Sequence, residues 1–70
     1  MSQKIYWCGP LTNCDISGKP FGKVMYDAKT PLGWANICQE TFDHFGCKLG
    51  TGLGQKYELQ DDGRWLKVEG

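Results

Sequence analysis

Two short motifs in this chain have the form of a metal-binding framework in which half of the ligands have been replaced. Residues 14–17 read Cys-Asp-Ile-Ser, residues 38–41 read Cys-Gln-Glu-Thr, and 23 residues separate the two cysteines. With cysteine at Ser17 and Thr41, the chain would carry the Cys-x-x-Cys…Cys-x-x-Cys pattern typical of a four-thiolate zinc site. Hydroxyl groups are poor zinc ligands at neutral pH. The pattern therefore predicts the fold of a small zinc module whose metal site has been lost or rebuilt.

The length and charge of the chain limit its architecture and its partners. Seventy residues form one domain, 1–70, and a domain this small is marginal unless it is stapled or unusually well packed. Three Trp, three Tyr and three Phe supply large apolar side chains, and four cysteines supply candidate staples. Eight basic and eight acidic residues cancel. Because nucleic-acid binders normally carry a basic surface, nucleic acid is a less favoured partner than protein.

No targeting or membrane segment is recognisable in the sequence. Residues 1–4 are polar and no apolar run follows them, so neither a signal peptide nor a membrane span is predicted. We therefore expect a protein of the cytoplasm, where thiols stay reduced. In a secreted chain the four cysteines would instead form two disulfides, in any of three pairings.

The first half of the chain is expected to contain strands and a metal knuckle, a tight turn that points two ligand positions at one centre. The run 4–8 is β-prone, and the segment 12–20 is rich in turn residues. Gly18 supplies the positive φ that a knuckle requires. We predict a second strand over 21–26 and a hairpin loop over 27–33.

A short helix is predicted over 37–45. Asn36 is expected to be its N-cap, with Gln39 in the N3 place of a capping box, and Gly46 is expected to end it. One apolar stripe at helical spacing is formed by Cys38, Phe42 and Phe45.

The end of the chain predicts a β-hairpin. Two β-prone runs, 55–60 and 64–68, flank Asp62-Gly63, a strong signal for a two-residue loop. That loop sets a register in which Leu59 faces Leu66 and places Trp65 on the opposite face, over water or under another element. The predicted buried face consists of Tyr57, Leu59, Leu66 and Val68.

A knuckle, a hairpin and a helix that begins with the second pair of positions together form the arrangement of a treble-clef zinc finger. The runs 14–21, 33–42 and 49–57 resemble small phage and prophage proteins of unassigned role, which carry cysteine at the positions of Ser17 and Thr41. This resemblance implies an α+β, treble-clef-like or zinc-ribbon-like domain of viral origin, with a knuckle, antiparallel β-hairpins and one short helix. It implies no assigned activity.

Three states of the altered site remain open. In the first, the site is vestigial and Cys14 and Cys38 are buried thiols packed against Ser17 and Thr41. In the second, the two cysteines form a disulfide, worth about 3–4 kcal/mol in the chain-entropy model. In the third, a rebuilt zinc site recruits Cys8, Cys47 or His44. Because zinc sites need complete ligand sets, no metal is expected at positions 14, 17, 38 and 41, and zinc is the one cofactor that the pattern leaves open.

Other candidate sites have simpler interpretations. His44 follows Cys38 by six positions, which on a helix turns it away from the Cys38 face and toward solvent. Cys8 and Cys47 are of a type that is often a small core residue. The glycine-rich run 50–54 leads into a predicted strand rather than a helix, so it is interpreted as a connector and not as a phosphate loop. No nucleophile elbow or paired ligand motif is present, and the chain is not expected to be an enzyme.

The aromatic residues suggest a binding function. Trp, Tyr and Arg dominate interface hot spots, so Arg64, Trp65 and Trp34 are the candidate binding residues. Trp65 has an alternative interpretation, as a residue that covers the back of the sheet under the N-terminal strand. We predict a phage-type accessory protein that binds a host or viral protein in the host cytoplasm, with blocking of a host factor as one mode of action. The alternative is a zinc-ribbon-like nucleic-acid-binding module, and the oligomeric state is open.

Overall fold

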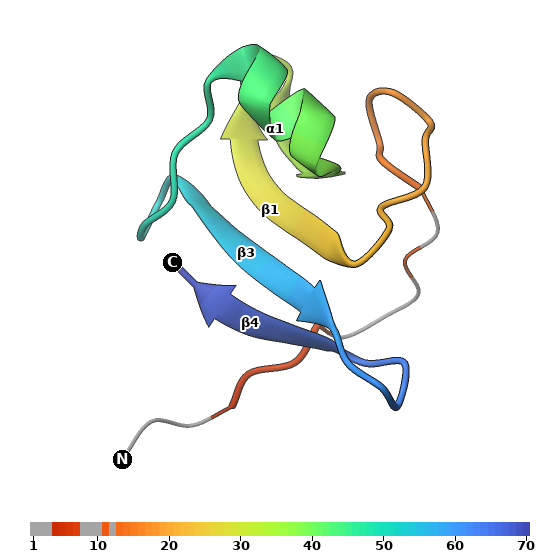
Figure 1. Ribbon diagram of the computed structural model, residues 1–70. Coiled ribbons are helices and arrows are strands. Elements are labelled where there is room, and N and C mark those ends of the chain that lie inside the picture. Colours follow the sequence, from red (N-terminus) through yellow and green to blue (C-terminus); the bar gives the residue numbers. More distant parts are fainter. Residues whose placement is uncertain (1–3, 8–10, 12) are drawn as a thin grey trace.

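The computed structural model describes residues 4–7, 11 and 13–70, and within them it contains one antiparallel sheet and one helix (Figure 1). In chain order the elements are β1 (Val24–Thr30), β2 (Gly33–Ile37), α1 (Gln39–Phe45), β3 (Gly54–Leu59) and β4 (Trp65–Glu69). The strand order is β2-β1-β3-β4, and each neighbouring pair is antiparallel. The structure is therefore a small α+β domain, as the sequence predicted.

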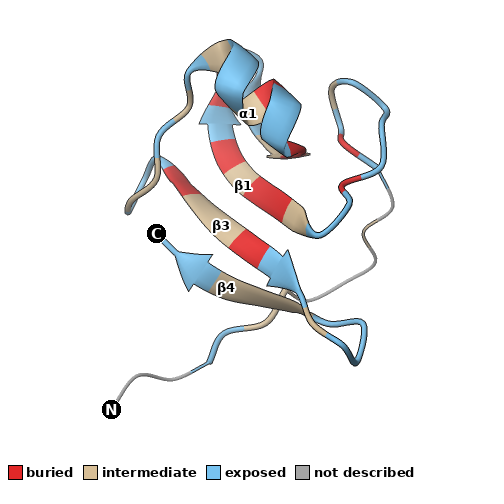
Figure 2. Cartoon of the chain, in the orientation of Figure 1, coloured by how far each residue is buried: buried red, intermediate tan, exposed pale blue. Residues whose placement is uncertain are grey.

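Strand β1 lies at the centre of the core and carries several buried residues (Figure 2). Two consecutive residues, Met25 and Tyr26, are buried, so the strand packs on both faces of the sheet. On the face covered by α1, the Tyr26 ring stacks on Phe42 with 3.9 Å between ring centroids. Successive side chains of a strand point to opposite faces, so Met25 lies on the other face, where it is fully buried. Its register partner on β3 is Tyr57, which is also buried. Packing on both faces lets this short chain bury a continuous core.

Aromatic side chains pack together on the face of the sheet that is opposite α1. The rings of Trp7 and Tyr57 meet edge to face with 5.6 Å between centroids. Phe21 and Trp65 make the same type of contact at 5.9 Å. Edge-to-face pairs of this kind contribute about 0.5–1.5 kcal/mol beyond their buried area. These rings connect the N-terminal segment and the loop before β1 to the two C-terminal strands.

The described part of the predicted first strand, 4–7, lies along the outer side of β4. Tyr6 forms an isolated antiparallel bridge with Leu66, and the Lys67 N–H donates to the Ile5 carbonyl at 2.7 Å. The segment predicted as a strand therefore makes only an isolated bridge to β4, and Cys8 lies outside the described residues.

The first hairpin has a shorter loop than the sequence predicted. The strand expected over 21–26 lies at Val24–Thr30, so the loop expected over 27–33 is wrong and is reduced to a two-residue turn at 31–32. The polar residues in that range alternate with the buried Ala28 and Thr30. In a strand with one exposed side such alternation is compatible with β structure.

The helix begins two residues later than predicted. Its N-cap is Cys38, not Asn36, because Asn36 still belongs to β2. The expected capping box is also wrong, since the side-chain oxygen of Gln39 accepts a hydrogen bond of 2.5 Å from the Tyr26 hydroxyl. The predicted helix end is confirmed, because Gly46 adopts the left-handed conformation with φ of 64°.

The C-terminal hairpin is present, but its predicted register is wrong by one position. Its loop has three residues, 61–63, closed by a hydrogen bond of 2.7 Å from the Gln60 N–H to the Arg64 carbonyl. Gly63, with φ of 88°, occupies the third loop position. A type I turn followed by a left-handed residue is the usual three-residue loop. The sequence signal Asp-Gly fits this loop as well as the two-residue one.

The shifted register reverses the faces that were predicted for β4. Leu59 pairs with Trp65 instead of Leu66, so Trp65 lies on the core face. The predicted burial of Leu59 and Val68 is wrong, because their side chains are 38% and 39% exposed. Of the predicted buried face, Tyr57 is buried and Leu66 is half-buried.

Candidate functional site

The segment 14–18 forms the knuckle that the sequence predicted. The Gly18 N–H donates to the Cys14 carbonyl at 3.0 Å, and Gly18 has the expected positive φ of 75°. The Ser17 N–H points at the Cys14 sulfur, with 3.4 Å between nitrogen and Sγ. Asp15 fixes the knuckle to β2, because its N–H donates to the Asn36 carbonyl at 2.8 Å and its carboxylate accepts from the Asn36 N–H at 2.9 Å.

The second pair of positions lies at the start of α1. Cys38 precedes the helix as its N-cap, and its carbonyl accepts the Phe42 N–H at 2.9 Å. Thr41 is the buried residue of the helix. One turn of helix therefore brings the Thr41 hydroxyl to 3.3 Å from the Cys38 sulfur.

The two pairs converge. The Cys14 sulfur lies 3.4 Å from the Thr41 hydroxyl, across 27 positions of sequence. The Ser17 hydroxyl lies 3.7 Å from the Cys38 sulfur. Cys14, Cys38 and Thr41 are only 3%, 6% and 6% exposed. The prediction that residues 14, 17, 38 and 41 surround one centre is confirmed, and we call these four residues the thiol–hydroxyl quartet.

The quartet changes the acidity of one thiol. Burial raises the pKa of Cys14, but hydrogen bonds from the side chain and backbone of Ser17, from Thr41 and from the Cys38 backbone outweigh burial and lower this pKa from 9.0 to about 6. Cys14 is then mainly a thiolate at neutral pH. The Thr41 hydroxyl lies within hydrogen-bonding distance of both sulfurs, at 3.4 Å from Cys14 and 3.3 Å from Cys38.

A pocket of about 340 Å³ opens beside the quartet. The hydroxyl residues Ser17 and Thr41 lie in its wall, and the pocket is lined by Ile16, Ser17, Glu40, Thr41, His44 and Phe45. Glu40 is held by a surface ion pair of 3.1 Å with Lys19, across the knuckle. His44 is exposed, as the sequence predicted, and it also lines this pocket, which the sequence did not indicate.

The donor set of the quartet does not fit zinc. A structural zinc site has four nitrogen, sulfur or carboxylate ligands, and the quartet offers two thiols and two hydroxyls. Among the described residues no group of three or more His, Cys, Asp and Glu side chains is arranged to hold a metal ion. Cys47, a candidate for a rebuilt site, contacts the Lys29 carbonyl at 3.7 Å instead, and burial raises its pKa. The candidate Cys8 lies outside the described residues, and Cys14 and Cys38 are free thiols.

The three predicted binding residues do not share one surface. Trp34 belongs to the edge strand β2 and is 51% exposed. Trp65, at the start of the opposite edge strand β4, is half-buried against Phe21. Arg64 is exposed, where it pairs with Asp62 at 2.8 Å and lies over the Tyr6 ring. The position of Trp65 matches its alternative interpretation as a residue that covers the sheet beneath the N-terminal segment.

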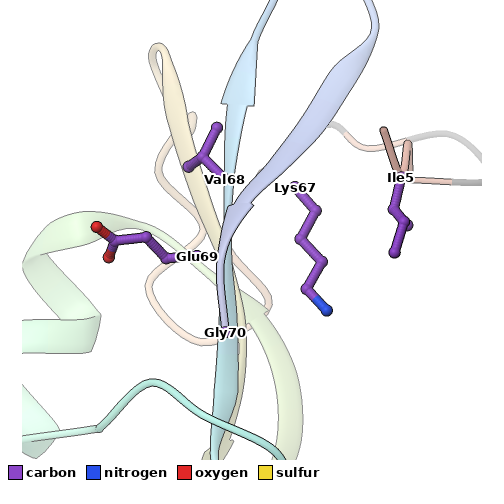
Figure 3. Close-up of a pocket in the computed structure, with 5 residues that line it drawn as sticks. All are labelled: Ile5, Lys67, Val68, Glu69 and Gly70. Atoms are coloured by element: carbon purple, nitrogen blue, oxygen red, sulfur yellow. The ribbon is translucent and has the colours of Figure 1, made fainter. Parts of the chain in front are cut away.

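A second pocket, of about 240 Å³, lies at the end of β4 (Figure 3). Its charged residues are Lys67 and Glu69, and Figure 3 shows them on opposite sides of the strand. The remaining lining residues are Ile5, Val68 and Gly70. This pocket therefore brings no set of reactive groups together.

No protein-family model, curated protein or solved structure matches this chain. Across the described part of the chain, no helix has the length and apolar character needed to cross a membrane.

Proposed function

We propose that this chain is a small, non-enzymatic accessory protein of the phage type that binds an extended segment of a host or viral protein at the edge of β2 beside Trp34. In this proposal the domain is treble-clef-like and its zinc site is vestigial. A knuckle at 14–18, a hairpin made by β1 and β2, and helix α1 follow one another in treble-clef order. The quartet occupies the place of the four thiolates, and the resemblance over about residues 14–57 to phage proteins supports the same assignment.

The observation that carries the proposed function is the direction of the β2 main chain. Both main-chain groups of Asn36 bond to Asp15, which lies outside the sheet. Main-chain groups alternate in direction along a strand, so those of Trp34 also point outward. Among the described residues, none is placed to form a hydrogen bond with the main-chain N–H or carbonyl of Trp34. An extended peptide fits such an edge, because its own main chain supplies the matching donor and acceptor.

Two exposed apolar side chains lie at this edge. Leu32 in the β1–β2 turn is 76% exposed, and Trp34 is 51% exposed. Aromatic residues that become buried on binding are common hot spots, and truncation of a hot spot typically costs about 2 kcal/mol or more. Leu32 was not identified from sequence, since it fell within the predicted loop. The signal that was available is an apolar residue inside a predicted loop.

The test selects peptide ligands from a displayed library of random dodecamers on the wild-type protein. The expected ligands are extended, with apolar residues at alternate positions. Trp34→Ala should lower the affinity of the protein for these peptides about 30-fold. Val68→Ser is the matched control, because Val68 is an exposed apolar residue on the opposite edge strand, and it leaves affinity unchanged. Methylation of the peptide nitrogen that faces the Trp34 carbonyl abolishes binding.

Two results would overturn this proposal. One is a set of ligands whose binding is unaffected by Trp34→Ala or by methylation of the peptide backbone. The other is binding of single- or double-stranded nucleic acid that weakens steeply with salt, since the release of counterions from phosphates produces such a dependence. A contact made by Trp34 and main-chain groups changes little over the same range of salt.

A further inference from the structure

We propose that Cys14 and Cys38 bind one monovalent soft cation, Cu(I), between their two sulfurs, while Ser17 and Thr41 donate hydrogen bonds to those sulfurs and do not bind the metal. This site goes beyond the proposed protein-binding function and does not depend on it. The binding step forms two Cu–S bonds, and each thiol that is protonated releases its proton to water.

The donor set selects this metal. Both sulfurs lie within 3.3–3.4 Å of the single Thr41 hydroxyl, so they are directed at one small volume. Thiolates are soft ligands that favour Cu(I). In the described residues no third His, Cys, Asp or Glu side chain joins them to form a metal-binding group. Cu(I) is stable with two thiolates in a line, whereas zinc needs four ligands.

The two hydroxyl residues have a role in this site. Two thiolates and one Cu(I) carry a net charge of minus one, and a buried charge requires hydrogen-bond donors. The Ser17 N–H lies 3.4 Å from the Cys14 sulfur, and the Ser17 hydroxyl lies 3.7 Å from the Cys38 sulfur. The Thr41 hydroxyl reaches either sulfur. Groups of this kind orient metal ligands, and their loss typically weakens metal binding about 10–100-fold.

The pocket beside the quartet provides access for the cation. Ser17 and Thr41 separate the buried sulfurs from this pocket, so a small movement of two hydroxyl side chains connects the sulfurs to solvent. A large thiol reagent has no equivalent route to sulfurs that are 3% and 6% exposed.

The experiment titrates the reduced protein with Cu(I) under nitrogen, against bicinchoninate, whose coloured Cu(I) complex reports the metal that the protein has not taken. We expect one Cu(I) per chain, and X-ray absorption at the copper edge should show two sulfur neighbours. Cys14→Ser and Cys38→Ser should each weaken binding at least 100-fold. The matched control is Cys47→Ser, whose thiol contacts the Lys29 carbonyl away from the quartet, and it should bind as the wild type does.

Thr41→Val keeps both thiols and the side-chain shape, so it tests the site even if a cysteine variant fails to fold. It should retain one Cu(I) per chain with affinity reduced about 10–100-fold. The proposal is overturned if the wild type does not compete with bicinchoninate, or if Cys8→Ser or Cys47→Ser removes binding. Stoichiometric zinc retained by the reduced wild type would also overturn it, because zinc requires further ligands.

Discussion

Restoration of two cysteines should convert the quartet into a zinc site. In the double variant Ser17→Cys plus Thr41→Cys, all four positions carry thiols. Zn–S bonds of about 2.3 Å place the sulfurs of a tetrahedral site about 3.8 Å apart. Of the six distances between the side-chain sulfur and oxygen atoms of the quartet, three already measure 3.3, 3.4 and 3.7 Å. The backbone therefore needs little movement to accept the metal.

The expected stabilisation follows from mass action. Free zinc at about 1,000 times its dissociation constant stabilises the folded state by about 4 kcal/mol. For a domain of this size, about 1 kcal/mol raises Tm by about 4–8 °C. The double variant should therefore melt about 15–30 °C higher with zinc than with a chelator, while the wild type should show no such difference.

The assay combines elemental analysis with thermal unfolding of the same samples, followed by circular dichroism. Ser17→Ala plus Thr41→Ala is the control, since it removes both hydroxyls and adds no ligand. We expect one zinc per chain in the cysteine variant and none in the control. A folded cysteine variant that takes up no zinc would refute the argument that the four side chains point at one centre.

Three further predictions concern stability. Because folding lowers the pKa of Cys14 from 9.0 to about 6, the folded state binds fewer protons than the unfolded state between these values. The advantage of the wild type over Cys14→Ser in the free energy of unfolding should therefore grow from pH 6 to pH 9 in urea titrations, and a constant difference would contradict the assignment. Gly18→Ala should cost about 1–2 kcal/mol, because Gly18 has φ of 75°, and an unchanged urea midpoint would argue against the knuckle. Met25→Ala should cost about 2–5 kcal/mol, since Met25 is 0% exposed, and a loss below that range would place this side chain outside the core.

Local signals in the sequence were sufficient for the knuckle, and the order of knuckle, hairpin and helix along the chain predicted the meeting of the four quartet positions. Spacing of three within each motif fixes a pair on one short element, and the knuckle and the start of the helix each present their pair in one direction. Gly18 and Gly46 adopt the left-handed conformations that their positions indicated. The turn at 14–18 and the end of α1 depend on a few consecutive residues, so tertiary packing had little influence on them. The meeting of Cys14 with Thr41 spans 27 positions and is a tertiary contact.

The failures have two origins, which are contacts between segments distant in sequence and a turn signal that is compatible with two loop lengths. Asn36 is a good N-cap residue, but Asp15 of the knuckle holds its main chain in β2. The loop signal Asp62-Gly63 is compatible with loops of two and of three residues, and the difference reverses the face on which Trp65 lies. The position of Trp34 on an edge strand could not be predicted from local sequence, because it depends on the order of the strands in the sheet.

The most direct measurement of the central claim is a nuclear Overhauser spectrum of the reduced, metal-free protein. The knuckle and the first turn of α1 should give cross-peaks between the Thr41 methyl protons and the β protons of both Cys14 and Cys38. A spectrum in which Thr41 shows cross-peaks to Cys38, one turn away in sequence, but none to Cys14, which lies across the fold, would contradict the convergence on which the account depends.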